Sequence, residues 1–119
     1  MKKIFKSIYY AMVLLTNMIV AKIPSRHFRK LVYKMLGAKI GRKSIICRNC
    51  EMLRPSKLRI GRNVAVGWRV LFDSRGGITI GNNVNISSDT QFITGSHEVN
   101  DPQFKSKFKP IKVEDNTWI

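Results

Sequence analysis

Large apolar residues recur every six positions along the middle of the chain, and this spacing constrains the fold more than any other feature. The residues concerned are Ile40, Ile46, Met52 and Leu58, then Ile60, Val66, Phe72 and Ile78, then Ile80, Ile86 and Phe92. The series restarts every 20 residues, at the Ile-Gly pairs that begin at positions 40, 60 and 80. Such a period matches neither an α-helix nor an amphipathic strand. It predicts a chain that turns a corner every six residues around a triangular core.

The residues between these apolar positions suit tight corners and close stacking. The fifth place of each six-residue unit is usually small or β-branched, as in Ser44, Cys50, Ser56, Val64, Val70, Gly76, Val84, Thr90 and Ser96. Positive φ angles at the bends are expected from Gly41, Gly61, Gly67 and Gly81, together with Asn63 and Asn83. Successive coils should stack about 4.8 Å apart as parallel strands, with isoleucine above isoleucine in the core.

This repeat resembles that of the hexapeptide-repeat acyltransferases, whose coils form a left-handed parallel β-helix. The left-handed sense is implied by the resemblance, because spacing alone does not fix it and left-handed crossovers are otherwise rare. We therefore expect an all-β solenoid over residues 37–119, preceded by one or two α-helices within residues 1–36.

The first third of the chain is basic and contains a long apolar run. The formal net charge is +15, eleven Lys and Arg precede residue 44, and the first acidic residue is Glu51. The run from Ile8 to Val20 is shorter than the roughly 20 residues that cross a bilayer. Residues 1–36 are therefore predicted to form a peripheral or monotopic anchor on an anionic membrane, at the cytoplasmic face of the plasma membrane. A signal peptide, or a helix packed on the solenoid or on another subunit, remains an alternative.

A second helix is predicted after Pro24, with Ser25 as its N-cap and Gly37 as its stop. The apolar residues at helical spacing are Phe28, Leu31, Val32, Met35 and Leu36, and this face is expected to cover the open end of the first coil. The basic residues expected to point into solvent are Arg26, Arg29, Lys30 and Lys34.

The cysteine and histidine content argues against a metal centre. Cys47 and Cys50 form the only Cys-x-x-Cys pair, and no second pair completes four zinc ligands. We interpret Cys50 as a buried corner residue. The two histidines, His27 and His97, are too few for a γ-type carbonic anhydrase, which shares the β-helix but needs three. A nucleic-acid partner is not expected, because no nucleic-acid motif accompanies the positive charge.

The repeat breaks after Phe92. The next segment that fits begins at Val113, which lies 33 residues after Ile80 instead of 20. About thirteen residues therefore leave the coil and return to it. This interruption predicts a protruding loop at about residues 98–112, and long excursions from a solenoid often carry binding function.

The segment before this loop, Thr94-Gly95-Ser96-His97-Glu98, resembles the maltose, galactoside and capsular-polysaccharide O-acetyltransferases. Residues 76–84 and 110–119 resemble the same branch. The resemblance implies transfer of an acetyl group from acetyl-CoA to a saccharide or lipid-linked glycan hydroxyl, with His97 as the general base and no metal. Neutral imidazole can accept such a proton at pH 7. Glu98, Asp101 or a backbone carbonyl could orient the ring.

Further candidates for the acceptor or acetyl-CoA pocket are Ser96, Glu98, Asp101, Trp118 and Asp73. Trp118 matches a tryptophan of the family and either walls the pocket or covers the solenoid. Asp73, Ser74 and Arg75 lie one coil below the His97 region by the 20-residue phase. There they either meet a sugar or form a solvated corner.

In the related enzymes, later coils form much of a coenzyme A cleft that neighbouring chains share in a homotrimer. This chain ends at Ile119, where the repeat predicts a glycine and further coils. We therefore expect it to be truncated at its C-terminus, with an uncovered strand edge. The alternative function is a catalytically inactive fragment or a membrane-associated scaffold.

Overall fold

The computed structural model describes residues 2–119. Two helices come first, α1 (Lys2–Met18) and α2 (Arg26–Met35), with the 3₁₀ turn η1 (Val20–Lys22) between them. The strands are β1 (Lys39–Ile40), β2 (Ile45–Ile46), β3 (Glu51–Leu53), β4 (Leu58–Ile60), β5 (Ala65–Val66), β6 (Leu71–Asp73), β7 (Ile78–Ile80), β8 (Asn85–Ile86), β9 (Gln91–Ile93), β10 (Gly95–His97), β11 (Ser106–Phe108) and β12 (Ile111–Val113). The turns η2 (Pro55–Lys57) and η3 (Ser74–Gly76) lie between strands.

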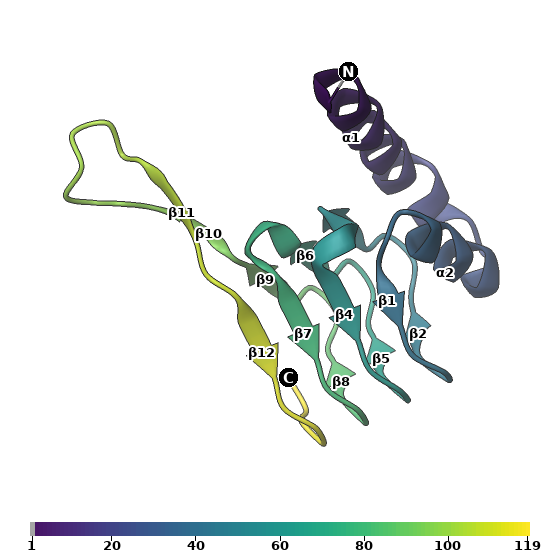
Figure 1. Cartoon of the computed structure of the whole chain (residues 1–119). Helices are drawn as coiled ribbons and strands as arrows, with labels where there is room; N and C mark the ends of the chain where they lie inside the picture. The colour runs from purple at the N-terminus through teal and green to yellow at the C-terminus, as the bar shows by residue number, and fades with distance from the viewer. Residues whose placement is uncertain (1) are drawn as a thin grey trace.

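Three parallel sheets form the walls of a triangular coil (Figure 1). Their strand orders are β1-β4-β7-β12, β2-β5-β8 and β3-β6-β9. The register advances by one coil at a time, so that Ile40 lies beside Ile60 and Ile60 beside Ile80. The predicted fold class, a left-handed parallel β-helix preceded by helices, is confirmed.

The core is a continuous column of stacked side chains. All eleven apolar residues at the six-residue spacing are buried, with at most 7% of their surface exposed. Phe72 and Phe92, one coil apart, stack with ring centroids 5.3 Å apart and planes 2° apart. Because parallel coils repeat the same height, each core residue packs on its counterpart in the next coil.

The corner glycines have a role that differs from the predicted one. Gly41, Gly61, Gly67 and Gly81 do not have positive φ angles. A β-carbon on Gly61 would lie 2.5 Å from Asn82 Oδ1 and 2.7 Å from the Gly81 carbonyl oxygen. Glycine is required there because adjacent coils approach too closely for a side chain, and not because of backbone conformation.

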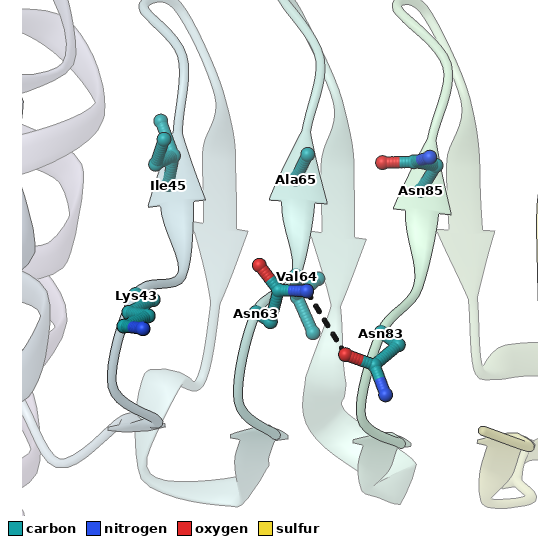
Figure 2. Close-up of a pocket in the computed structure, with 7 residues that line it drawn as sticks. All are labelled: Lys43, Ile45, Asn63, Val64, Ala65, Asn83 and Asn85. Carbon is teal, nitrogen blue, oxygen red and sulfur yellow. Dashed lines mark hydrogen bonds between the residues drawn. The ribbon is translucent and has the colours of Figure 1, made fainter. Parts of the chain in front are cut away.

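Positive φ angles fall instead on stacked residues with side chains. Lys43, Asn63 and Asn83 occupy the same corner of successive coils, with φ of 62°, 55° and 57°. Asn63 Nδ2 donates to Asn83 Oδ1 at 2.9 Å, as Figure 2 shows. The prediction for the two asparagines is therefore confirmed, in keeping with the tolerance of asparagine for left-handed backbone.

One of the three corners differs from the other two. The first corner of each coil, before β2, β5 and β8, is filled by the buried residues Ser44, Val64 and Val84. The second corner, before β3, β6 and β9, is filled by buried Cys50 and Val70 and by half-buried Thr90. At the third corner, Ser56 and Ser96 are exposed and Gly76 is half-buried. The chain passes through η2, η3 or the start of β10 there, and both α1 and the β10–β11 hairpin rise from this edge (Figure 1).

The N-terminal helices satisfy the open edge of the first coil with polar side chains. Asn17 of α1 pairs with Met52 as a neighbouring strand would, since its Nδ2 donates to the Met52 carbonyl and its Oδ1 accepts from the Met52 amide, each at 2.9 Å. Lys30 Nζ of α2 donates to the carbonyls of Gly41 at 3.0 Å and Ser44 at 3.3 Å. Such cover protects an edge that could otherwise pair with another chain.

The predicted ends of α2 are confirmed. The Ser25 hydroxyl accepts a hydrogen bond from the Phe28 amide at 3.2 Å, as an N-cap does. Gly37 follows the helix with a φ of 106°, which a residue with a side chain rarely adopts.

The predicted buried face of α2 is wrong for Phe28, Leu31 and Met35, which are exposed, whereas Leu36 is buried and Val32 is half-buried, as predicted. Arg29, which was expected to point into solvent, is buried, and so is Tyr33. The physical reason lies in the surface beneath the helix, which presents backbone carbonyls that need donors. Arg29 Nη2 donates to the Ile46 carbonyl at 2.7 Å, and its Nη1 donates to the Ile23 carbonyl.

The protruding segment is a two-stranded antiparallel hairpin rather than an irregular loop. Gly95 pairs with Phe108, and His97 pairs with Ser106. After the hairpin, Val113 takes its place beside Ile80, as the interrupted repeat predicted. The excursion therefore leaves the register of the coil unchanged.

The first helix presents a wide apolar face to solvent. Its exposed apolar residues are Ile4, Phe5, Ile8, Tyr10, Met12, Leu14, Leu15 and Met18. The segment Lys2–Lys22 has 21 residues and contains an 18-residue stretch with a mean hydropathy of 1.6, of which only 17% is buried, so it is long and apolar enough to cross a membrane. Signal sequences and buried core helices share this length and composition. This span is longer than the run counted from Ile8 to Val20.

Arg29→Met should lower the free energy of unfolding by about 2–4 kcal/mol, because two carbonyls beneath α2 would lose charged donors. Arg26→Met, on the same helix but exposed, should change it by less than about 0.5 kcal/mol. Urea denaturation followed by circular dichroism measures both. Equal effects of the two substitutions would contradict the role assigned to Arg29.

Candidate active site

The Thr-Gly-Ser-His-Glu segment stands where the third corner of the coil becomes the hairpin. Thr94 is buried, and its Oγ1 donates to the Asp73 carbonyl at 2.7 Å and accepts from the Gly76 amide at 2.8 Å. The Thr94 carbonyl accepts from the Lys109 amide at 3.1 Å, where the hairpin returns. Thr94 thus joins the coil below to both ends of the hairpin and fixes the point where it begins.

Asp73 ends strand β6 and lies buried beneath the hairpin, where it holds Arg75. Its two carboxylate oxygens accept from Arg75 Nε at 2.7 Å and Arg75 Nη2 at 2.9 Å. The side-chain hydrogen bonds from Arg75 are the main cause that lowers the pKa of Asp73 below its ordinary value. Asp73 and Ser74 are only 2% and 0% exposed, so the alternative of a solvated corner is wrong for both.

Arg75 connects this buried carboxylate to the hairpin. Its guanidinium carbon lies 4.9 Å from the centroid of the Phe108 ring, in a cation–π contact. A β-carbon on Gly95 would lie 2.7 Å from Arg75 Nη2 and 3.0 Å from the Phe108 ring. The glycine of the motif therefore leaves room for Arg75 against the base of the hairpin.

His97 lies on the same face of the hairpin as this cluster. Directly paired residues of antiparallel strands share a face, and residues two apart on one strand do as well. Gly95, Phe108 and His97 therefore face one way, while Ser96 and its partner Lys107 face the other. The backbone of His97 lies roughly 7 Å beyond that of Gly95 along the strand.

The ring of His97 is held by a backbone carbonyl, one of the three alternatives left open by the sequence. His97 Nδ1 lies 2.9 Å from the carbonyl oxygen of Phe104. Because a carbonyl can only accept, Nδ1 carries the proton in this hydrogen bond, and Nε2 of the neutral ring is left with a free lone pair. Phe104 has a φ of 49°, so the residue that turns its carbonyl toward the ring lies in left-handed backbone.

The two acidic candidates for orienting the ring have other partners. Glu98 lies 3.5 Å from Lys107 Nζ in an ion pair. Asp101 Oδ1 accepts from the Gln103 amide at 2.9 Å and so shapes the tip of the hairpin.

Trp118 lies on a different wall of the coil from the hairpin. It bridges to Asn85 and thereby extends the β2-β5-β8 sheet, with 82% of its surface exposed. The structure thus does not bring it to His97 within this chain. Asp73 does belong to the site, because it holds Arg75 at the base of the hairpin. Two further residues of the site, Thr94 and Phe104, were not singled out from the sequence. The 20-residue phase could have pointed to Thr94, while no sequence signal identifies the Phe104 carbonyl.

Two other features do not add chemistry to this site. Burial raises the pKa of the Cys50 thiol to about 11, and its Sγ lies 3.2 Å from the Gly67 carbonyl, as suits a corner residue. The hollow in Figure 2, about 160 Å³, has Lys43 as its one ionisable side chain. Across residues 2–119, no three His, Cys, Asp or Glu side chains gather in a way that could hold a metal ion.

The three-sided coil and its protruding histidine hairpin define a hexapeptide-repeat solenoid. No family model and no solved structure matches the sequence. Two curated proteins do, each described as "Putative colanic acid biosynthesis acetyltransferase WcaF", from Escherichia coli strain K12 and from Shigella flexneri. Each is 32% identical to this chain over 92 residues.

The alignment covers 77% of this chain and 50% of each relative, so the chain spans about half the length of the curated relatives it matches. Together with the repeat and the fold, it shows that the chain is a distant homologue within the hexapeptide-repeat acyltransferase family. The resemblance stated from the sequence is thereby confirmed.

Proposed function

We propose that this chain carries the general base of an acetyl-CoA-dependent O-acetyltransferase that modifies a saccharide or glycan hydroxyl. The observation that supports it best is the 2.9 Å hydrogen bond from His97 Nδ1 to the Phe104 carbonyl, on an exposed hairpin. This bond directs the free lone pair of Nε2 away from the backbone, where an acceptor hydroxyl can meet it. Homology to acetyltransferases supports the same reaction class.

In the proposed reaction, His97 Nε2 removes the proton of the acceptor hydroxyl while the oxygen attacks the thioester carbonyl carbon of acetyl-CoA. The carbon–sulfur bond then breaks, and the proton on Nε2 passes to the departing thiolate. The Phe104 carbonyl stabilises the imidazolium that exists between these two transfers. The reaction needs no acyl-enzyme, and the buried Cys50 thiol is not placed to form one.

The proposal includes a homotrimer as the assembly that acts on the substrates. A homotrimer would bring a neighbouring chain against the exposed walls of the coil, and exposed Trp118 on the β2-β5-β8 sheet suits such a contact. Ser96 is exposed on the opposite face of the hairpin from His97, so it points away from a substrate that meets Nε2 of the same chain.

His97→Gln should lower acetyl transfer by roughly 10²–10⁴-fold in the protein that contains these residues, because the hydroxyl loses its proton acceptor. His27→Gln is the matched control, since it removes the other, exposed histidine of the chain and should leave the rate unchanged. Release of the coenzyme A thiol measures the rate. Transfer that survives His97→Gln at the parent rate would contradict the assignment.

We also propose that α1 and α2 rest on an anionic membrane at the cytoplasmic side. Like α1, α2 leaves large apolar side chains exposed, namely Phe28, Leu31 and Met35. The same N-terminal segment carries exposed basic residues, namely Lys2, Lys3, Lys6, Lys22, Arg26 and Lys34. An apolar face bordered by cations is typical of interfacial helices, so the exposure of the apolar side of α2 supports this placement.

Leu31→Glu should weaken binding to phosphatidylglycerol vesicles by about tenfold or more, because it removes an apolar side chain from the membrane and adds a negative charge. Ile93→Glu is the control, since Ile93 is about equally exposed, at 53% against 55%, but lies on strand β9. Vesicle flotation measures both. A protein that stays with the soluble fraction, or an equal loss in the two variants, would contradict the proposal.

A further inference from the structure

A groove of about 740 Å³ separates α1 from the third corner of the coil. Its apolar walls come from Phe5, Tyr9 and Val13 on α1 and from Leu53 on the coil. Its volume lies within the range of pockets that hold small organic ligands. Phe5 is also 66% exposed, so the groove opens toward the apolar face of α1.

The charged side chains that line this groove are all cationic. Lys6, Arg54 and Arg75 line it, and no acidic residue does. Arg75 is bound by Asp73 through Nε and Nη2, which leaves the donors of Nη1 free. Lys6 and Arg54 form no ion pair within the described residues, so the groove carries uncompensated positive charge.

Arg54 is also held in an uncommon backbone conformation. Its φ is 54°, whereas Ser74 and Thr94, the equivalent residues of the next two coils, do not have positive φ angles. The first coil therefore differs from the next two in backbone conformation at this corner.

The groove and His97 meet at Arg75. One side of Arg75 lines the groove, and the other contacts Phe108 and Gly95 at the base of the hairpin face that bears His97. A ligand with its anionic group at Arg54 and Arg75 would therefore have its far end directed along the hairpin toward the imidazole.

The geometry points to a lipid phosphate as the occupant of this groove. The hydrocarbon chain lies along Phe5, Tyr9 and Leu53, the phosphate lies between Arg54, Lys6 and Arg75, and a glycan linked to the phosphate extends toward His97. This inference rests on the proposed function and names its acceptor as a glycan carried on a membrane lipid phosphate. A free sugar would leave the apolar wall unused, and a neutral lipid would leave the cations unpaired.

The test is saturation labelling with a benzophenone-tagged farnesyl phosphate, using the full chain in neutral phosphatidylcholine nanodiscs and mapping the labelled residues by mass spectrometry. We expect label on the groove-lining residues Phe5, Tyr9 and Val13 and within residues 53–56. Arg54→Gln should raise the half-saturating concentration about tenfold, because a charge-assisted contact is lost. Arg54→Lys should restore most of the binding, and Arg62→Gln, with the same charge loss at another corner, should change it less than about twofold.

Several results would overturn the inference. One is an equal rise in the half-saturating concentration for Arg54→Gln and Arg62→Gln, and another is saturable labelling by the tagged farnesol, which has no phosphate. The inference would also fail if coenzyme A displaced the probe and untagged farnesyl phosphate did not, or if label were confined to the outer residues Ile8 and Leu31. His97→Gln separates this inference from the proposed chemistry. It should leave labelling unchanged while lowering transfer by roughly 10²–10⁴-fold, and a variant that retains both would refute the catalytic assignment but not the groove.

Discussion

Stacking of equivalent apolar side chains, one above another every 20 residues, is the interaction on which the whole structure depends. Each coil has too few residues to bury its own core, so it is stable only against a neighbour in the same register. The close approach that this stacking requires explains the corner glycines, since a side chain at Gly61 would strike the next coil. It also explains why the hairpin returns the chain to the same register, with Val113 beside Ile80.

The functional proposals concern one corner because two corners are occupied by packing. Small buried side chains and left-handed residues close those two. The third lets the chain depart, through η2, η3 and the hairpin, and α1 lies over it. A buried carboxylate, Asp73, holds Arg75 at this edge, and Thr94 fixes the hairpin to the coil. The rigid solenoid thus sets the position of His97, which lies on a segment outside it.

Periodicity in the sequence was sufficient to predict the coil, the apolar core and the interrupted repeat, while His97 was singled out by the resemblance of its motif to the O-acetyltransferases. It failed where the partner of a residue is a backbone group. The apolar side of α2 was expected to pack on the coil, yet the coil edge presents carbonyls, so Arg29 is buried and Leu31 is exposed. The carbonyl of Phe104 that holds His97 likewise depends on the turn of the hairpin, which no repeat encodes.

The central claim is that the hairpin holds His97 as a neutral base with Nε2 unprotonated. A long-range proton–nitrogen correlation spectrum of ¹⁵N-labelled protein at alkaline pH reads the tautomer of each imidazole directly, and exposed His27 serves as the internal reference. We predict that His97 is predominantly the Nδ1–H tautomer, in which the proton lies toward the Phe104 carbonyl. An Nε2–H tautomer at His97 would contradict the account, because that ring could not accept the proton of an acceptor hydroxyl at Nε2.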